Sequence, residues 1–370
     1  MALPPPTLDH PARVALRRRL GGRQRCLADV RKSSRGQCRH LAGPALCSRA
    51  GGSGPVGTLE ERVVSTELIA ILASWGIATL RSATPLIFAT LGETLVQRVG
   101  IINLGTEGEM LLGACVGFAV GVATGNPWLG LTAGALAGAT LSLLHAGLVL
   151  GAGANQIGSG LAVWMIALGA TSYVGRTLVG QQVTPLPALG TDWTDGIPII
   201  GEVLSQMTLA APLALLAVIF AAWWLNQTRP GLHWKAVGES ALVAAENGIR
   251  PTRVRVTAIM VGGLLAGFGG AILSVDYTQT WAQEMTKGRG LVAVGLVIVA
   301  RWKPALVLPV CLLFGLTEVA TLRLQSAGFE LSPHLLGTAP YLVVLAVLVA
   351  SHIFARRASA MPADLKAVFQ

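Results

Sequence analysis

Polar side chains and glycines gather in one short stretch between two apolar runs. The stretch is RVGIINLGTEGEM, residues 98–110, with ATPLIFATLGETL before it and LLGACVGFAVGVATG after it. It offers the amide of Asn103, the hydroxyl of Thr106, and the carboxylates of Glu107 and Glu109. These groups can hydrogen-bond a polar solute, and the glycines around them permit close approach. The stretch is a candidate contact for a small polar molecule.

A second pair of amides follows the small residues GAGA, where Asn155 and Gln156 start another apolar run. Both sites admit a purely structural interpretation. Glu107 and Glu109 then serve only as first-turn residues, where the helix dipole favours anions, and Asn155 and Gln156 open a helix in the same way. The residues alone leave both interpretations open.

The composition of the chain indicates whether these groups lie in a soluble protein or in a membrane protein. The chain has 370 residues, of which 52% are hydrophobic and 12% charged, and its mean hydropathy is +0.61. A soluble domain carries about 25% charged residues. This is the composition of an integral membrane protein.

Apolar runs then locate the membrane crossings. Scanning for about 20 apolar residues gives candidates near 66–80, 83–97, 107–125, 127–151, 156–180, 207–227, 254–275, 290–300, 305–320 and 338–354. Several are short or interrupted, so we expect an all-α polytopic bundle of about eight to ten transmembrane helices, some broken. Backbone groups that face lipid must be satisfied within their own helix. We expect residues 66–97 to cross twice, turning around Arg81.

Charge asymmetry predicts the orientation. No Lys or Arg lies between Arg176 and Arg229, and the polar part of that interval is acidic, whereas the loop at 228–255 carries five basic residues. Under the positive-inside rule the acidic loop faces outward and the basic loop faces the cytoplasm. The basic pairs near residues 301–303 and 356–357 agree.

Glycine spacing predicts how the helices pack. Glycines recur every fourth residue over 113–125 and again over 130–138. Such a face lets two helix backbones approach closely in lipid. We expect compact small-residue seams and no direct contact with solute there.

The first 59 residues hold 11 Lys and Arg against 2 Asp, while the rest of the chain is nearly balanced. We expect a disordered basic tail or a start codon assigned too far upstream, and deletion of the tail should leave insertion and transport intact. No aromatic residue interrupts it, so we expect no nucleic-acid partner.

The cysteines form no metal or disulfide pattern, and Cys115 and Cys311 are expected to pack inside apolar helices.

Motifs of soluble enzymes are absent. The sequence has no phosphate-binding loop, no H-E-x-x-H and no G-x-S-x-G. An ion-coupled transporter would need titratable groups in its core; the candidates are Glu93, Glu107, Asp276 and Glu318.

The basic loop itself contains a short helical pattern. In ESALVAAENGI, residues 239–249, Ser240 can cap a helix and Gly248 can end it. The simplest interpretation is an amphipathic loop on the lipid headgroups.

Four segments in order carry a resemblance to a known family. They are residues 84–114, 155–173, 231–249 and 288–304, which ends in GLVIVARWKP. The chain over about 65–370 resembles the inner-membrane permease subunits of bacterial ABC importers, most closely the branch for simple sugars and nucleosides, related to the ribose and branched-chain amino-acid permeases. Trp164 and Lys303 depart from the usual Asn of that branch, which puts a transferred substrate contact at residue 164 in doubt.

The resemblance implies a transport subunit without catalytic residues, cofactor or metal, set in the bacterial inner membrane. Its implied partners are ATP-binding cassette ATPase subunits, an extracytoplasmic solute-binding protein and a second permease subunit, with a heterodimer favoured and a homodimer possible. We divide the chain into the tail 1–59, a transmembrane domain 60–358 with a cytoplasmic coupling loop at 228–255, and a cytoplasmic tail 359–370.

The expected solute is a nucleoside or a simple sugar, and the alternative function is an ion-coupled secondary transporter. Discontinuous helices form transporter binding sites, so the expected solute path includes Asn103, Thr106, Glu107, Asn155 and Gln156. Replacing Gly105 with Leu should impair transport, because a side chain would disfavour a glycine-type backbone conformation and crowd the path.

Coupling to the ATPase is assigned to the small residues of the loop helix and one carboxylate: Glu239, Ala244, Ala245 and Gly248. The small side chains would let the helix sit in a cleft of the partner. A Gly248→Trp substitution should therefore weaken ATPase association.

Overall fold

The computed structural model describes residues 57–189, 207–327, 333–354 and 361–366, most of them helical. The expected tail 1–59 lies outside these residues except for the start of α2, and so does most of the acidic loop, 190–206. The helices are α2 (Gly57–Gln97), α3 (Thr106–Thr124), α4 (Pro127–Ala146), α5 (Gln156–Val174), α7 (Ala210–Gln227), α8 (Arg229–Glu239), α9 (Ala241–Glu246), α10 (Pro251–Ile272), α11 (Arg289–Val299), α12 (Pro304–Ser326), α13 (Pro333–Phe354) and α14 (Ala363–Lys366). Short π or 3-10 turns extend three of them: η2 (Gly147–Gly151), η3 (Gly175–Thr177) and η4 (Leu273–Tyr277).

The expected polytopic helical bundle is confirmed. Within the described ranges, seven helices are long and apolar enough to cross a membrane, and two shorter apolar helices accompany them, Arg289–Val299 and Leu336–Ala350. The part of the chain that the structure describes contains no strand, only an isolated bridge between Ala188 and Thr208.

The expected double crossing around Arg81 is wrong. Residues 66–97 lie in one uninterrupted helix, whose apolar part is Ile71–Gln97. Arg81 does not end the helix because its side chain is half-buried in the bundle, where it acts electrostatically on Asp276 of η4. A charge that faces the bundle interior can lie at mid-helix.

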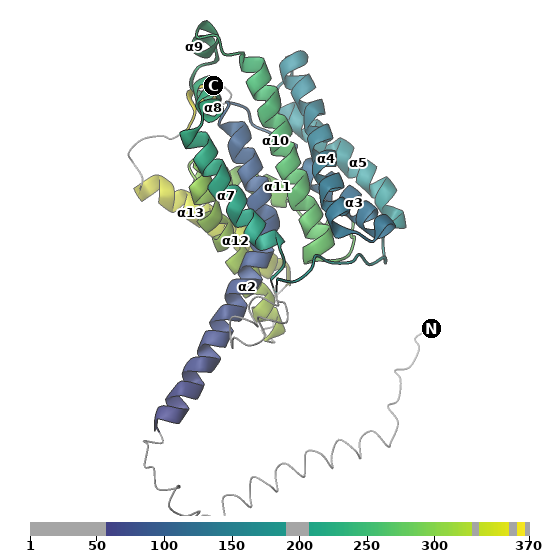
Figure 1. The fold of residues 1–370 in the computed structure, drawn as a ribbon, viewed down its shortest axis with the longest axis vertical. Helices are drawn as coiled ribbons and strands as arrows, with labels where there is room; N and C mark the ends of the chain where they lie inside the picture. The colour runs from purple at the N-terminus through teal and green to yellow at the C-terminus, as the bar shows by residue number, and fades with distance from the viewer. Residues whose placement is uncertain (1–56, 190–206, 328–332, 355–360, 367–370) are drawn as a thin grey trace, which may run out of the picture. The chain divides into compact units, whose positions relative to one another are not determined.

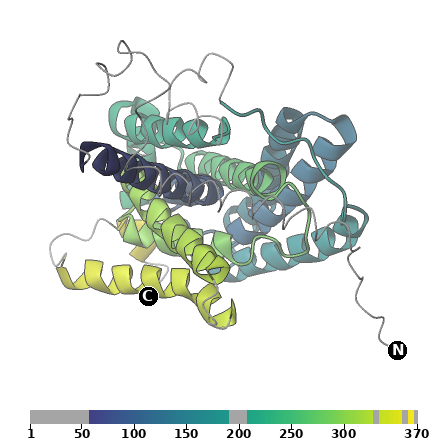
Figure 2. The same cartoon turned by 90° about the horizontal axis from the view of Figure 1, so that it is seen from below.

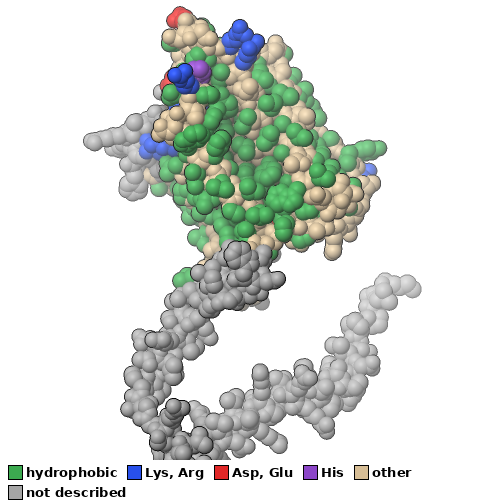
Figure 3. Space-filling model, in the orientation of Figure 1, with side chains coloured by type: hydrophobic (Ala, Val, Ile, Leu, Met, Phe, Trp, Pro, Cys, Tyr) green, Lys and Arg blue, Asp and Glu red, His purple; other side chains and the backbone are tan. Residues whose placement is uncertain are grey.

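Figure 1 shows the helices running up and down between two ends, with α8 and α9 at one end. We call this the basic end; it comprises α8, α9, α14 and the loops 98–105 and 300–303. Figure 3 shows Lys and Arg side chains gathered at the basic end, above a flank of hydrophobic side chains. Since α3, α4, α5 and α7 alternate in direction, the glycine-rich stretch reaches the same end as the basic loop.

Glycine seams join α3, α4 and α10, as expected from their spacing. A Cβ at Gly134 would lie 2.5 Å from the carbonyl oxygen of Gly113, and one at Gly130 would lie 2.6 Å from that of Gly117. Gly113 and Gly138 likewise face glycines of α10, so closely that a side chain would overlap backbone. The view of Figure 2, along the bundle, shows α10 surrounded by its neighbours. Backbone contact of this kind is the means by which helices associate in lipid.

Helix α11 is the broken element of the bundle. Its 11 residues are too few to cross a membrane at about 1.5 Å per residue. Within the described ranges, the non-glycine residues with positive φ all flank it: Gln279, Glu284 and Lys287 before it, and Arg301 and Trp302 after it. Left-handed backbone at such residues is strained and persists only where the surroundings hold it.

Candidate functional site

The glycine-rich stretch is bound to α2 through Glu93, a carboxylate that is only 1% exposed. One oxygen, Oε1, accepts hydrogen bonds from the Gln97 side chain at 2.9 Å and from the backbone N–H of Asn103 at 3.1 Å. The other, Oε2, accepts from the Thr106 hydroxyl at 3.1 Å. The loop therefore turns back from the end of α2 to the level of Glu93 before α3 begins.

Asn103 connects this carboxylate to a second one. Its side-chain Nδ2 donates to Glu109 Oε1 at 2.7 Å, and its side-chain Oδ1 accepts from the N–H of Gly105 at 2.9 Å. Asn103, Thr106 and Glu109 are all buried. The structure thus brings Asn103 and Thr106 together in one hydrogen-bonded network, which we call the Glu93 network.

The backbone reason expected for Gly105 is wrong. Its φ is −69° and its ψ is −9°, which any residue adopts. Space is the constraint instead, because a Cβ would lie 2.8 Å from Asn103 Oδ1 and 3.2 Å from Val163 Cγ1. The left-handed glycine of this stretch is Gly100, with φ +83°.

Glu107 points away from the Glu93 network and holds the start of α11. Its Oε1 accepts from the Thr286 hydroxyl at 2.6 Å and from the N–H of Gly288 at 2.9 Å. Its Oε2 accepts from the N–H of Gly290 at 2.6 Å and from that of Leu291 at 3.4 Å. The first N–H groups of a helix have no partner within it, and a carboxylate there also complements the dipole. The contacts of Glu107 fit an anchor for α11.

The two amide side chains of the second predicted site, Asn155 and Gln156, contact different parts of the protein. Asn155 is exposed and caps α5, with its Oδ1 accepting from the N–H groups of Ile157 at 2.9 Å and Gly158 at 3.1 Å. Gln156 instead reaches the glycine-rich stretch, where its Oε1 accepts from the N–H of Ile102 at 2.9 Å. Of the two side chains, Gln156 is the one that hydrogen-bonds the glycine-rich stretch, and it does so next to Asn103.

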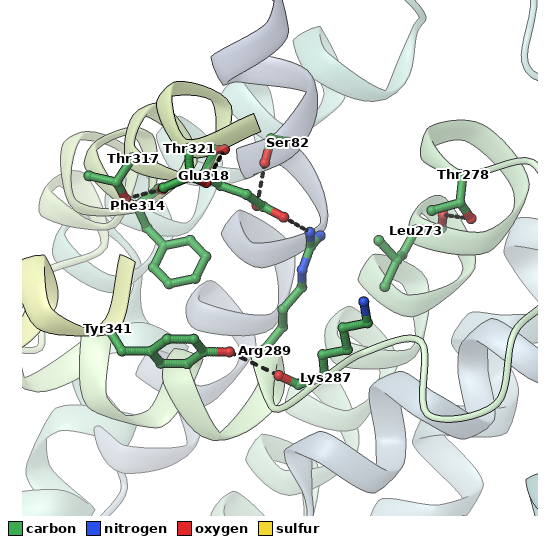
Figure 4. Close-up of polar contacts among 10 residues, drawn as sticks. All are labelled: Ser82, Leu273, Thr278, Lys287, Arg289, Phe314, Thr317, Glu318, Thr321 and Tyr341. Atoms are coloured by element: carbon green, nitrogen blue, oxygen red, sulfur yellow. Dashed lines mark hydrogen bonds and ion pairs between the residues drawn. The ribbon is translucent and has the colours of Figure 1, made fainter. Parts of the chain in front are cut away.

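A second polar centre lies where α11 begins. Figure 4 shows Arg289 extending toward Glu318 of α12, with Ser82 of α2 approaching the same carboxylate. Arg289 forms an ion pair with Glu318 Oε1, and the Ser82 hydroxyl donates to Oε2 at 2.6 Å. The guanidinium carbon lies 5.6 Å from the ring centre of Tyr277. Four separate parts of the chain, α2, η4, α11 and α12, thus meet at this pair.

Three buried polar atoms, on Arg289 and on the sequence neighbours of Ser82 and Tyr277, have no hydrogen-bond partner among the described residues. They are Nη1 of Arg289, Nε of Arg81 and Oδ1 of Asp276, whose Oδ2 accepts from the Thr208 hydroxyl at 2.7 Å. The residues Arg81, Ser82, Asp276, Tyr277, Arg289 and Glu318 are called the midspan cluster below. Sequence reasoning named Asp276 and Glu318 only for an ion-coupled mechanism and missed both arginines. For Arg81 the available signal was its position between two apolar runs, and for Arg289 its position at the start of one.

The basic loop forms two helices. Ser240 ends α8 and caps α9, accepting from the N–H of Val243 at 3.3 Å, and Gly248 after α9 has φ +80°. The expected cap and stop are confirmed, but the helix over 239–249 is shorter than expected and α8 precedes it. Ala244 is 3% exposed and packs into the protein, while Leu242 is 80% exposed.

Comparison with known proteins places the chain in a family. Residues 77–352 match the family described as branched-chain amino acid transport system, permease component. The chain belongs to this family. It is a multi-pass membrane protein and a transport component of ABC importers, not an enzyme.

Individual relatives are also named as ABC transporter permease proteins. The permease is 36% identical over 73% of its length to the putative glucose ABC transporter permease protein TsgC13 of Haloferax volcanii, covering 89% of that protein. It is 30% identical over 68% to the guanosine ABC transporter permease protein NupQ of Bacillus subtilis (83% covered), and 31% over 76% to the nucleoside ABC transporter permease protein NupC of Lactococcus lactis subsp. cremoris (92% covered). No solved structure matches the permease.

In the permease, α8 rests directly on the glycine-rich stretch. A Cβ at Gly238 would overlap the carbonyl oxygen of Arg98. The Arg98 Nε donates to the carbonyl oxygen of Trp302 at 2.6 Å, and the Trp302 indole donates to Gln97 Oε1 at 2.7 Å. Burial lowers the pKa of the Arg98 guanidinium, and the charge of Glu239 opposes that change.

The C-terminal segment of the permease also packs on the basic end. Leu365 of α14 is 1% exposed and lies against Ile102, Val297 and Trp302. Asp364 forms an ion pair with Arg255 of α10. The described part of the predicted tail 359–370 is therefore folded onto the bundle.

Proposed function

We propose that this chain is the translocation subunit of an ATP-driven importer for a neutral, polyhydroxylated solute, a nucleoside or a simple sugar. The relatives named above for glucose, guanosine and nucleosides support this class. The proposed location is the bacterial inner membrane, and the work comes from separate ATPase subunits.

The observation that carries the proposal is the exposed apolar face of α9. Leu242 is 80% and Val243 55% exposed, on a helix outside the membrane-spanning segments. Apolar side chains exposed at such a place mark a protein contact. We assign that contact to the ATPase. Ala245, Gly248 and Glu239 lie at or beside this face, whereas Ala244 packs inward and holds α9 to the bundle.

Contacts lead from this face into the bundle. The α8 backbone abuts Arg98, Arg98 binds the carbonyl of Trp302, and Trp302 follows the C-terminal end of α11. The N-terminal end of α11 is held by Glu107 and continues into the Arg289–Glu318 pair. We propose that movement of α8 and α9 on ATPase closure shifts α11, a rigid-body coupling across an interface.

The remaining partners are assigned by position. A solute-binding protein would dock at the end of the bundle opposite the basic end. A second permease subunit, a related chain or an identical copy, would complete the path. Asn103 and Thr106 bind Glu93, and Gln156 binds the N–H of Ile102 in a loop of the basic end, so their contribution to the path is proposed as support of the cytoplasmic side.

The docking assignment is tested by Leu242→Asp. A buried carboxylate at the interface should abolish co-purification of the ATPase and ATP-driven uptake, while the permease remains inserted, because Leu242 contributes little to its own core. Val179→Asp is the matched control for ATPase co-purification alone, since Val179 is 58% exposed outside the spans and follows the end of α5 that is opposite the basic end. Retention of the ATPase by Leu242→Asp contradicts the assignment.

The requirement for a small side chain at the ATPase contact is better tested by a substitution at Ala245 than by one at Gly248. Gly248→Trp would strain a backbone at φ +80° whatever the partner does. Ala245 is exposed in a regular helix, so Ala245→Trp changes the side-chain volume alone.

Uptake in reconstituted vesicles that needs an ion gradient and no ATP would instead support the ion-coupled alternative.

A further inference from the structure

Part of the midspan cluster lies within the membrane-spanning helices, whereas Asp276 and Tyr277 are the last two residues of the span Pro251–Tyr277. Arg81 and Ser82 are near the middle of the apolar part of α2, Ile71–Gln97, and Glu318 lies within the span Pro304–Ser326. Arg289 is the first residue of the broken helix α11. Ionisable groups at this depth are costly, and interrupted helices at this depth form solute sites in transporters.

The cluster holds more hydrogen-bonding capacity than the protein itself uses. Arg289 is 11% and Glu318 22% exposed by side chain, so the pair is not fully enclosed by the protein. The partnerless atoms include donors on Arg81 and Arg289 and an acceptor on Asp276. Leaving a buried polar group without a partner costs about 1–3 kcal/mol, and a solute that satisfies them recovers this.

Charges in the cluster balance. Arg81 and Arg289 face Asp276 and Glu318, while Lys287 and Glu107 add one further charge of each sign nearby. In Figure 4 the Lys287 side chain extends beside that of Arg289. No net charge favours an ion, so the fitting solute is neutral and rich in both donors and acceptors.

We propose that the Arg289–Glu318 pair, with Arg81 and Asp276, binds the vicinal hydroxyls of a sugar or ribose ring during translocation. This inference rests on the proposed function and names the part of the solute that is recognised. Each hydroxyl can donate to a carboxylate and accept from a guanidinium, and two adjacent hydroxyls match one such pair. The Tyr277 ring beside Arg289 offers an apolar face to the ring of the solute.

The test compares each solute with its deoxy analogue. ATP-driven uptake is measured in liposomes that contain the complete importer, for guanosine against 2′-deoxyguanosine and for glucose against 2-deoxyglucose. For each protein, the preference is the uptake rate of the full diol divided by that of the deoxy analogue. The preference of the wild type is then divided by the preference of Glu318→Gln. The same binding protein serves both, so its own selectivity cancels. We expect the preference to fall by about tenfold or more, the effect of one hydrogen bond to a charged group.

Asp364→Asn is the matched control, because it breaks the other ion pair among the described residues without entering the cluster. It should leave the ratio unchanged. Equal losses for both solutes in Glu318→Gln and Arg289→Lys overturn the proposal and leave the pair a structural link. Absence of ATP-driven uptake of all four solutes by the wild type overturns the proposed function, and this inference with it.

A second measurement does not depend on variants. Phenylglyoxal modifies accessible guanidinium groups, and its rate at Arg81 and Arg289 can be followed by mass spectrometry in the wild-type importer. Glucose or guanosine at millimolar concentration should slow labelling at these two positions, and the deoxy analogue should slow it less. Equal labelling with and without solute counts against the site.

Discussion

Each buried carboxylate at the glycine-rich stretch is defined by the donors around it. Glu93 and Glu109 bind the stretch itself, whereas Glu107, two residues before Glu109, binds the short helix α11. Neighbouring residues on one helix face different sides, so adjacent glutamates serve different elements.

Replacement of Glu107 should show whether its carboxylate anchors the start of α11. In Glu107→Ala the N–H groups of Gly288 and Gly290 lose their partner, so unfolding in detergent should become easier by about 1–3 kcal/mol. Thermal unfolding and uptake kinetics are measured together. The maximal rate should fall while the KM for solute stays constant. Normal stability with a raised KM would assign Glu107 to the solute path instead.

Gly105 allows a test of space against backbone conformation. Gly105→Ala should destabilise the permease because its Cβ would press on Asn103 Oδ1 at 2.8 Å. Combining it with Asn103→Gly removes that contact, so the double variant should be less destabilised than the two single effects added together. Strict additivity of the thermal shifts would rule out this contact as the cause.

At the scale of elements, α11 is a short helix held between strained backbone segments. Its ends contact Glu107 on one side and the Trp302–Gln97 bond on the other. A helix that is fixed at both ends can transmit displacement between them, because packed elements move as rigid bodies.

Two glycines at α11 should respond oppositely to alanine. Gly288 precedes the helix at φ +81°, and Gly295 lies inside it; a Cβ at either position meets nothing within 4 Å. Gly288→Ala should cost about 1–2 kcal/mol through left-handed strain alone. Gly295→Ala should stabilise by about 0.5–1 kcal/mol through helix propensity. Thermal unfolding of both variants checks the sign, and a shift of the same sign in both contradicts the assigned boundary of α11.

At the scale of the molecule, the bundle depends on the seams that join α3, α4 and α10. Gly267 of α10 fits against Gly134 and Gly138 of α4, and the neighbouring positions of α3 close the same seam. In lipid these contacts replace the hydrophobic effect as the reason for association.

Gly267→Val should therefore prevent assembly of the bundle while insertion of the individual helices continues. Its Cβ would lie 2.9 Å from the Cα of Gly138 and would overlap the Gly134 carbonyl, a cost above the roughly 1–3 kcal/mol of ordinary overpacking. Gly169→Val in α5 is the control, since open space surrounds that position. Membrane fractionation combined with protease resistance measures both, and equal resistance would show that the seam is dispensable.

Local patterns in the sequence determined the helices, the seams and the cap of α9, because apolar length, glycine spacing and capping residues act over one or two turns. They also identified the family. The sequence did not determine which helices continue through a charge: Arg81 predicted a turn, and only its half-buried place in the bundle makes α2 one helix. Nor could it separate Glu107 from Glu109, or bring Arg289 to Glu318 across 29 residues. Contacts between distant segments depend on how helices pack, and that information lies in the tertiary structure.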